Sequence, residues 1–331
     1  MRNCNKTPDI KSLTLTMTND LVDNQILVYD TETFCLLQTI GTFGKGGVSG
    51  SAFAIKQYDN KLFAAVNNGS NSVSLFKRKR NKLVFLQRVT TSSSPVSIDF
   101  GYNHMYVAGV TTVDSFSLCD FEKDGTVQLI LAQPGVPQVG NTSQISVAKN
   151  ELIVTIKTDP TPGTVDVISL CDDGSLSGEV IAISAPPNTT APFGFHVFND
   201  NTALISLAHS NNLGLFRNNT FVDVISLSQN APCWVTAIDK YAFTINAGSD
   251  TISRIVTTGK NIFVDIPVVA ASILTGNPSD ADQKDGNLVV MDHNSTTSHL
   301  NFFKVNEFGE LLPVGKPVDL GVRNANGVAI M

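Results

Sequence analysis

The sequence predicts an all-β fold, a seven-bladed β-propeller with four antiparallel strands in each blade. The first observation is a repeat: similar apolar segments recur every 40 to 49 residues, a spacing typical of a four-stranded propeller blade. The second is that each repeat consists of short β-rich runs separated by turn residues. The third is that no stretch shows a long helical period of apolar residues.

The repeats are located by the first residues of their inner strands, most of which open with proline or a small residue. From residue 53 the successive spacings are 42, 49, 48, 40, 46 and 46 residues, which gives six complete repeats up to about residue 321. The segments begin at Ala52-Phe53, Pro95-Val96, Gln144-Ile145, Pro192-Phe193, Pro232-Cys233, Pro278-Ser279 and Asn324-Ala325.

The two ends of the chain supply the seventh blade. The C-terminal run 326–331 has the pattern of an inner strand A without partners, and the N-terminal region has the pattern of the missing strands B, C and D, at residues 13–18, 25–30 and 34–40. We therefore expect one domain over residues 1–331, with a tail at 1–12 and blade one shared by 13–40 and 324–331. Closing the ring in this way removes an exposed sheet edge.

The third and fourth blades show the pattern inside a repeat. The third has predicted strands at 95–100, 105–108, 113–118 and 126–130, with a turn at Lys123-Asp-Gly125. The fourth has predicted strands at 144–147, 152–156, 165–170 and 178–183, with a turn at Asp172-Asp-Gly174. Asp-Gly pairs favour the positive φ angles that tight hairpins require.

The overall composition excludes several classes of protein. The 331 residues have a formal net charge of −6, and 16% of them are charged against 42% that are hydrophobic. Disordered chains have few apolar residues and nucleic-acid binders have excess lysine and arginine, so neither class fits. The basic run 77–82 is interpreted as a solvated outer hairpin. No apolar run reaches the roughly 18 residues of a membrane span, so we expect neither a membrane span nor a nucleic-acid partner.

Cysteines and glycosylation sequons favour an oxidising compartment. The five cysteines are too few for a disulfide scaffold and odd in number, but a disulfide between Cys4 and Cys35 would attach the N-terminal tail to blade one. The sequence predicts a secreted or secretory-pathway protein whose signal has been removed, with a cytoplasmic location left open. The Asn-x-Ser/Thr sequons, which are close to the number expected by chance, are at Asn5, Asn68, Asn141, Asn188, Asn218 and Asn294.

Four stretches make the sequence similar to a known family. They are 65–76 (AVNNGSNSVSLF), 94–97 (SPVS), 192–195 (PFGF) and 231–249 (APCWVTAIDKYAFTINAGS). Over residues 25–331 the chain resembles the lactonase-like seven-bladed propellers of the 6-phosphogluconolactonase or carboxymuconate-cyclase type. The resemblance implies the fold and a shared ancestry. It implies less about activity, because one propeller scaffold hosts many reactions.

Propeller geometry predicts where a ligand binds. Strand A of each blade lines the centre, and the connections from D to A share one face with the loops from B to C, so side chains of several blades converge there. Trp234, the only tryptophan, is predicted to form an aromatic wall with Phe193 and Phe195. The alternative for these three residues is packing between blades.

The catalytic hydrogen-bond donors are predicted to be His196, Arg323, Asn246 and Asn67. The alternative for a histidine is a satisfied core or loop residue, and the alternative for a cysteine is an inert buried thiol. Lys157 and Arg217 are the remaining cations considered for the pocket. Further substrate contacts are predicted for Cys233, His209, His293 and Asn326.

One departure from the family pattern affects the predicted chemistry. Residues 205–208 are Ile-Ser-Leu-Ala, where similar sequences have Val-Ser-Glu-Ala, so Leu207 replaces an acidic residue. The resemblance implies that lactone chemistry in this family uses His, Glu and Arg groups around the channel, and acid–base catalysis needs such pairs. Their depletion favours a reaction promoted by proximity, shape and a few hydrogen bonds.

The main functional prediction is therefore a cyclase or pericyclase of secondary metabolism. It would promote a hetero-Diels–Alder cycloaddition of a quinone-methide-like intermediate with a terpenoid, as the fungal hetero-Diels–Alderases that the chain resembles do. The predicted substrate is a neutral aromatic or terpenoid molecule. The first alternative is a lactonase or lactonizing cycloisomerase, which would need carboxylated substrates and a cationic channel. The second is a non-catalytic propeller that binds a protein or glycan on its rim; the oligomeric state stays open.

No cofactor and no metal are predicted. Residues 280–286 carry clustered carboxylates but lack the spacing and the closing glutamate of a calcium loop, and they are interpreted as a turn between strands A and B. Residues 41–47 are rich in glycine, but no helix follows that could bind a phosphate. They are interpreted as a mobile connection from D to A that overhangs the pocket.

Overall fold

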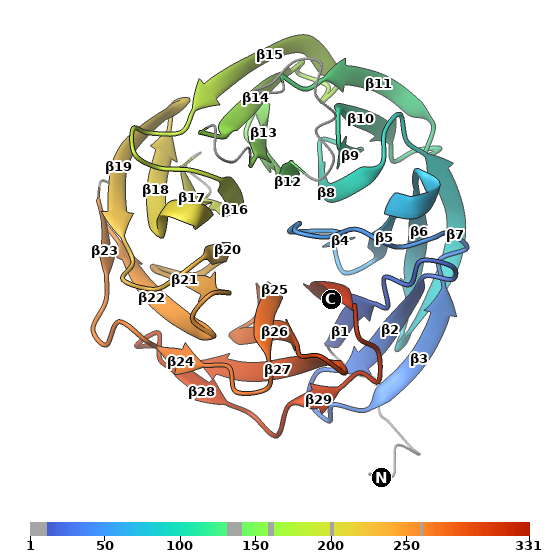
Figure 1. Cartoon of the computed structure of the whole chain (residues 1–331). Coiled ribbons are helices and arrows are strands. Elements are labelled where there is room, and N and C mark those ends of the chain that lie inside the picture. The colour runs from blue at the N-terminus through green and yellow to red at the C-terminus, as the bar shows by residue number, and fades with distance from the viewer. Residues whose placement is uncertain (1–11, 131–140, 158–161, 199–201, 259–260) are drawn as a thin grey trace.

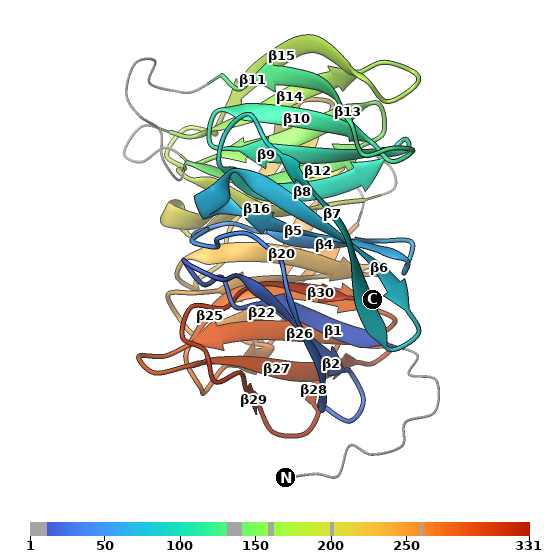
Figure 2. The same ribbon diagram turned by 90° about the vertical axis from the view of Figure 1, so that its right-hand side faces the viewer.

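Seven antiparallel sheets surround a common axis in the computed structural model, which describes residues 12–130, 141–157, 162–198, 202–258 and 261–331 (Figure 1). Five of the sheets have four strands, and the other two carry a short fifth strand. Figure 2 shows the ring from its edge, with the turns gathered at two rims. The predicted all-β, seven-bladed propeller is confirmed.

The strands of each blade are given from the axis outward. Blade 1 contains β30 (Asn326–Ile330), β1 (Leu13–Met17), β2 (Gln25–Asp30) and β3 (Leu36–Gly41). Blade 2 contains β4 (Ile55–Tyr58), β5 (Leu62–Asn67), β6 (Ser72–Lys79) and β7 (Lys82–Thr90). Blade 3 contains β8 (Pro95–Gly101), β9 (His104–Gly109), β10 (Thr112–Ser117) and β11 (Lys123–Gln128). Blade 4 contains β12 (Thr142–Ala148), β13 (Glu151–Ile156), β14 (Thr164–Leu170) and β15 (Leu176–Ser184).

Blades 5 to 7 follow the same order. Blade 5 contains β16 (Pro192–Val197), β17 (Ala203–Leu207), β18 (Asn212–Arg217) and β19 (Thr220–Ser226). Blade 6 contains β20 (Pro232–Ile238), β21 (Tyr241–Asn246), β22 (Thr251–Thr257), β23 (Ile262–Val264) and β24 (Ala271–Ser272). Blade 7 contains β25 (Asn277–Lys284), β26 (Asn287–His293), β27 (Ser298–Val305), β28 (Leu311–Pro313) and β29 (Val318–Asp319). Two 3-10 turns join second and third strands, η1 (Asn68–Ser70) in blade 2 and η2 (Ala208–Ser210) in blade 5.

The ring is closed in blade 1 by the two ends of the chain. Strand β30 pairs antiparallel with β1, and the backbone amide and carbonyl groups of Leu13 and Met331 exchange two hydrogen bonds of 2.8 Å. The prediction that the terminal strands share a blade is confirmed. Without β30, the inner edge of β1 would be unpaired.

Burial explains why the inner β-runs look apolar in the sequence. In β5 and β13 every residue except the first is buried, because the neighbouring blades cover both faces of these strands. The outermost strand β15 has no buried residue. The pattern of apolar residues is therefore strongest in the second and third strands of a blade and weakest in its outermost strand.

Aspartate side chains of the innermost strands connect neighbouring blades. Asp99 accepts a hydrogen bond from the backbone amide of Val147 at 2.8 Å, and Asp280 accepts one from Val328 at 3.0 Å. Residues 280–284 therefore belong to β25, and the prediction of a turn over 280–286 was wrong except at its last two residues. Burial raises the pKa of Asp280 to about 8, and its oxygen atoms accept hydrogen bonds from the backbone amides of Ala281 in the same strand and Val328 in the next blade.

The outer hairpin of blade 3 also differs from the prediction. Lys123-Asp-Gly125 begins strand β11 and is not a turn. The chain turns just before it, where Phe121 has a positive φ of 61° and its amide donates to the carbonyl oxygen of Ser117 at 2.9 Å. In blade 4 the predicted turn at 172–174 is confirmed, with Gly174 at φ +90°.

The cysteines divide into bonded and free groups. Cys35 takes part in a disulfide bond, and Cys119, Cys171 and Cys233 are free. The predicted partner, Cys4, lies outside the described residues, as does the N-terminal tail at 1–11.

Candidate functional site

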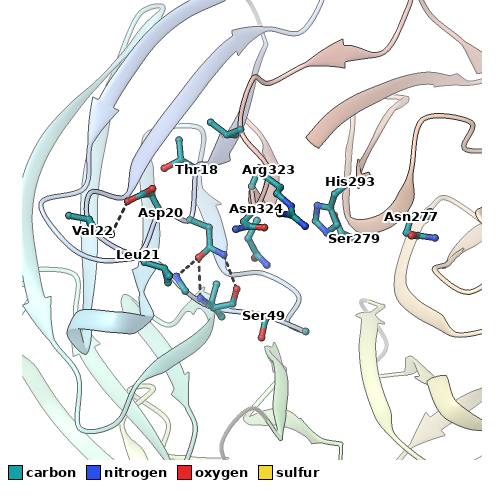
Figure 3. A pocket seen from close by; sticks show the side chains of 18 of the residues that line it. Thr18, Asp20, Leu21, Val22, Ser49, Asn277, Ser279, His293, Arg323 and Asn324 are labelled. Atoms are coloured by element: carbon teal, nitrogen blue, oxygen red, sulfur yellow. Dashed lines mark hydrogen bonds between the residues drawn. The ribbon is translucent and has the colours of Figure 1, made fainter. Parts of the chain in front are cut away.

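A cavity of about 800 Å³ opens where β20, β25 and β30 begin, beside the axis (Figure 3). Its walls come from the hairpin at 18–22, the segment 47–50, Trp234, residues 277–279, His293 and the segment 322–326. We call this space the mouth cavity. Blades 1, 6 and 7 contribute to it, together with the connection that leads into blade 2.

His293 and Arg323 lie together in one wall of the mouth cavity. The hydroxyl group of Ser298 donates to the backbone carbonyl oxygen of Arg323 at 2.9 Å and lies 3.5 Å from Nδ1 of His293. Figure 3 shows the guanidinium group of Arg323 and the ring of His293 in this part of the cavity. Burial lowers the pKa of His293, and the neighbouring Asp292 partly opposes this shift. The wall therefore presents an imidazole that is neutral near pH 7 beside a permanent cation.

A second wall is built on Asn19. Its side-chain oxygen accepts hydrogen bonds from the backbone amides of Gly47 and Val48 at 2.7 and 3.1 Å, and its nitrogen donates to the Val48 carbonyl oxygen at 2.9 Å. Gly46 lies against the backbone of Asn19, where a Cβ would approach to 2.3 Å. These bonds attach the end of the glycine-rich connection 41–47 to the hairpin of blade 1, and residues 47–50 line the cavity.

The aromatic wall predicted from the sequence is partly present. Trp234 lines the mouth cavity and donates from Nε1 to the carbonyl oxygen of Ser51 at 3.0 Å. Phe193 packs edge-on behind it, with ring centroids 5.6 Å apart. Phe195 is fully buried in the core between blades 4 and 5 and does not line the cavity.

Asn326 completes the group of predicted residues at the mouth cavity. It stands at the start of β30, and its side-chain oxygen lies 3.5 Å from the hydroxyl group of Ser51. Arg323, His293, Asn326 and Trp234 are thus brought together from blades 1, 6 and 7, whereas the other predicted site residues lie elsewhere.

Asn67 and Asn246 lie inside their blades. Each is fully buried at the end of a second strand, and each donates to a serine of the third strand: Asn67 to Ser74 at 2.8 Å, Asn246 to Ser253 at 3.0 Å. Neither side chain lines the mouth cavity. The structure therefore gives these amides a role in joining strands, and their predicted catalytic role has no geometric support.

The predicted histidines 196 and 209 are also separated from the mouth cavity. His196 lines a second cavity of about 240 Å³ together with Lys56, Thr236 and Asp282. Burial, with a smaller contribution from Lys56, lowers the pKa of His196 to about 4, so its ring is neutral at pH 7. His209 is exposed on η2.

Cys233 lies beside Lys157 and not in the lining of the mouth cavity. Burial raises the pKa of the Cys233 thiol to about 12, although the nearby Lys157 acts in the opposite direction. The thiol is therefore neutral and a poor nucleophile at physiological pH.

Sequence analysis missed several polar residues at the mouth cavity. Ser49 and Asn277 line it, and Ser298 joins His293 to Arg323. Ser49 and Asn277 stand close to the start of an inner strand, as the predicted Arg323 and Asn326 do. This position in the repeat was the signal that could have identified them.

The described residues contain neither a candidate metal site nor a membrane-spanning helix. No group of three or more His, Cys, Asp or Glu side chains in them is placed to hold a metal ion. None of their helices has the length and apolar character needed to cross a bilayer.

Comparison with known proteins shows the fold alone. No family model matches the sequence, and no curated protein matches it. A protein from Bacteroides uniformis described as a candidate 6-phosphogluconolactonase is 14% identical with a TM-score of 0.71, and the match covers 98% of this chain and 100% of that one. A protein of the same description from Bacteroides fragilis is 12% identical with a TM-score of 0.68, over 99% and 100% of the two chains.

The periplasmic gluconolactonase of Pseudomonas aeruginosa is 13% identical with a TM-score of 0.67, and the match covers 97% of this chain and 99% of that one. These structural neighbours are seven-bladed propellers of the 6-phosphogluconolactonase type. None of the three is described as a Diels–Alderase, so the finer resemblance stays a prediction.

Proposed function

We propose that the protein is an enzyme of small-molecule metabolism that hydrolyses a lactone in the mouth cavity. The observation that carries this proposal is the adjacency of His293 and Arg323, which Ser298 joins in one wall. Ester hydrolysis needs a base for water and a positive charge for the carbonyl oxygen. The names of the three structural neighbours support the same chemistry.

The geometry suggests how the two residues would divide the reaction. Water attacks the carbonyl carbon of the lactone while His293, neutral because burial lowers its pKa, accepts a proton from the water. Negative charge develops on the carbonyl oxygen, where the guanidinium group of Arg323 stabilises it. The bond between the carbonyl carbon and the ring oxygen then breaks. The ring oxygen takes the proton back from His293, and a hydroxy acid leaves.

Cycloaddition is the second candidate, and the apolar part of the mouth cavity favours it. Leu21 and Val22 are 69% and 79% exposed at the cavity, and Trp234 lies in its wall. Such a lining suits a neutral aromatic or terpenoid substrate that is held by shape. In this reaction Arg323 would donate to the growing charge on an oxygen atom, and His293 would have no proton to accept.

A hydrolysis assay tests the proposal. Proton release from D-glucono-1,5-lactone and its 6-phosphate, measured above the spontaneous rate, is compared for the wild type, His293→Gln and Arg323→Met. We expect turnover to fall by about 100-fold or more in both variants, the range for loss of an acid–base or charge-stabilising group. The matched control is His104→Gln, which removes a histidine that pairs with Asp124 away from the cavity.

Different outcomes separate the two candidates. If all three variants turned over the lactone at the wild-type rate, the mouth cavity would not be the site of lactone hydrolysis. Absence of lactone hydrolysis, combined with a rise in melting temperature on adding neutral terpenoid ligands, would replace hydrolysis by cycloaddition.

A further inference from the structure

Lys157 lies against the mouth cavity but outside the wall formed by His293 and Arg323. It directly follows β13, and its ammonium group is 4.9 Å from the centre of the Phe193 ring. The same Nζ atom donates a hydrogen bond to the carbonyl oxygen of Gly50, which lines the cavity. A side chain from blade 4 thus reaches the site built by blades 1, 6 and 7.

Residues of the cavity wall position this ammonium group. Gly50 has a φ of +56°, and a Cβ at this residue would lie 2.8 Å from the Nζ atom of Lys157. Trp234, which also lines the cavity, packs edge-on against the Phe193 ring under the ammonium group. A ligand that reached Gly50 and Trp234 would therefore lie close to the positive charge.

The described part of the chain provides no anion for Lys157. The neighbouring ionisable group is the Cys233 thiol, which burial keeps neutral by raising its pKa to about 12. A carbonyl oxygen and an aromatic face compensate only part of the lost hydration of an ammonium group. Partial burial accordingly lowers the pKa of Lys157 to about 8, and the group is still mostly protonated at pH 7.

Lys56, a lysine of the second cavity, shows the contrast. Its Nζ atom also lies over an aromatic ring, 3.2 Å from the centre of Phe53, but Asp99 provides a carboxylate oxygen at 3.8 Å. Both lysines contact a ring, but within the described residues only Lys56 has a counter-ion. A partly buried cation without a counter-ion is costly to the fold unless a ligand supplies the charge.

We propose that Lys157 binds an anionic substituent of the ligand, a carboxylate or a phosphate, while His293 and Arg323 face the lactone ring. This inference rests on the proposed function and deepens it, because it names the substrate class as lactones that carry a negative charge. Lys157 acts in specificity and takes no part in bond breaking.

Matched ligand pairs test this inference. Dissociation constants are measured by calorimetry at pH 7 for D-glucono-1,4-lactone against D-glucaro-1,4-lactone, which adds a carboxylate, and for D-glucono-1,5-lactone against its 6-phosphate. Non-hydrolysable analogues replace any member that is turned over during the titration. The two pairs decide between carboxylate and phosphate. We expect the wild type to bind one charged member about tenfold or more tightly than its neutral partner, as a charge-assisted hydrogen bond predicts.

Substitutions of Lys157 show whether this residue causes the preference for the charged lactone. Lys157→Met should remove it and leave the affinity for the neutral lactone within about twofold, whereas Lys157→Arg should retain it. Lys56→Met is the control, because it removes a lysine that already has a carboxylate partner. Melting temperatures of all variants show whether they are folded.

The outcomes distinguish this inference from the proposed function. The role of Lys157 is overturned if folded Lys157→Met still prefers the charged lactone. It is also overturned if the wild type shows no such preference, even if the protein hydrolyses lactones. A Lys157-dependent preference in a protein that hydrolyses no lactone supports the anion site and overturns lactone hydrolysis.

Discussion

Asp292 and His299 are joined by a hydrogen bond next to the wall of the mouth cavity, with 3.0 Å between Oδ1 of Asp292 and Nδ1 of His299. The carboxylate is fully buried, and it also accepts hydrogen bonds from Thr275 and Asn301. Asp292 immediately precedes His293 in β26. The buried network therefore fixes the end of the strand that presents His293 to the cavity.

We expect Asp292→Asn to lower the free energy of unfolding by about 3 kcal/mol, because it removes the charge from a buried, multiply bonded pair. Urea denaturation measures this loss. The control is Asp124→Asn, which breaks the pair with His104 at 2.9 Å, where the Asp124 side chain is 33% exposed. That change should cost less than about 1 kcal/mol. Equal losses in the two variants would contradict a special role for the Asp292 network.

The stability of the protein should fall in mildly acidic solution because of His196. Burial lowers its pKa from the usual 6.5 to about 4, so between these values the unfolded chain binds a proton that the folded protein does not. The stability that is present above pH 6.5 is therefore lost as the pH falls towards 4. His196→Gln should flatten the dependence of the melting temperature on pH in this window, and an unchanged slope would refute the assignment.

Asp280 should act in the opposite direction. Burial raises its pKa from 3.8 to about 8, so the folded protein retains a proton that the unfolded chain has released. Its contribution to stability is complete below pH 3.8 and is lost as the pH rises through 8. Asp280→Asn should show a shallower decline in melting temperature between pH 5 and 8, roughly the window set by these pKa values. Asp285→Asn, in the exposed turn that follows, should leave the decline as it is in the wild type.

Trp234 should report ligand binding without any label. It is the only tryptophan, it is 8% exposed, and it lies in the wall of the mouth cavity. A ligand that enters the cavity should change its emission on titration. Trp234→Phe should cost about 1 kcal/mol of stability, because it loses the hydrogen bond to Ser51. A saturable ligand that leaves the emission unchanged would bind outside this cavity.

The fold was predictable because a propeller repeats one short pattern, and six spacings near 45 residues fix the number of blades and the ring closure. The errors fell where local composition resembles a turn. Residues 280–284 are mostly polar, yet they form an inner strand that pairs with β26, and Asp280 reaches the backbone amide of Val328 in the next blade. Such a bond joins residues far apart in the sequence, and no local pattern reveals it.

The site was predictable only in part. Arg323, His293, Asn326 and Trp234 converge because they lie near the ends of inner or second strands at the same rim. Asn67 and Asn246 satisfy the same positional rule, but the third strand of each blade presents a serine hydroxyl group to them. Both serines follow their asparagine by 7 residues, so the shared spacing was a visible signal of an internal hydrogen bond.

The pairing of β30 with β1 also determines when the protein can finish folding during its synthesis. Strands β1 to β3 are made before the other six blades, but the innermost strand of their blade, Asn326–Ile330, is made after them. Blade 1 must therefore wait through the translation of the other six blades, with the edge of β1 unpaired. The pairing of β30 with β1 joins the two most widely separated strands of the ring, so the slowest step in reaching the native ring should follow the synthesis of β30.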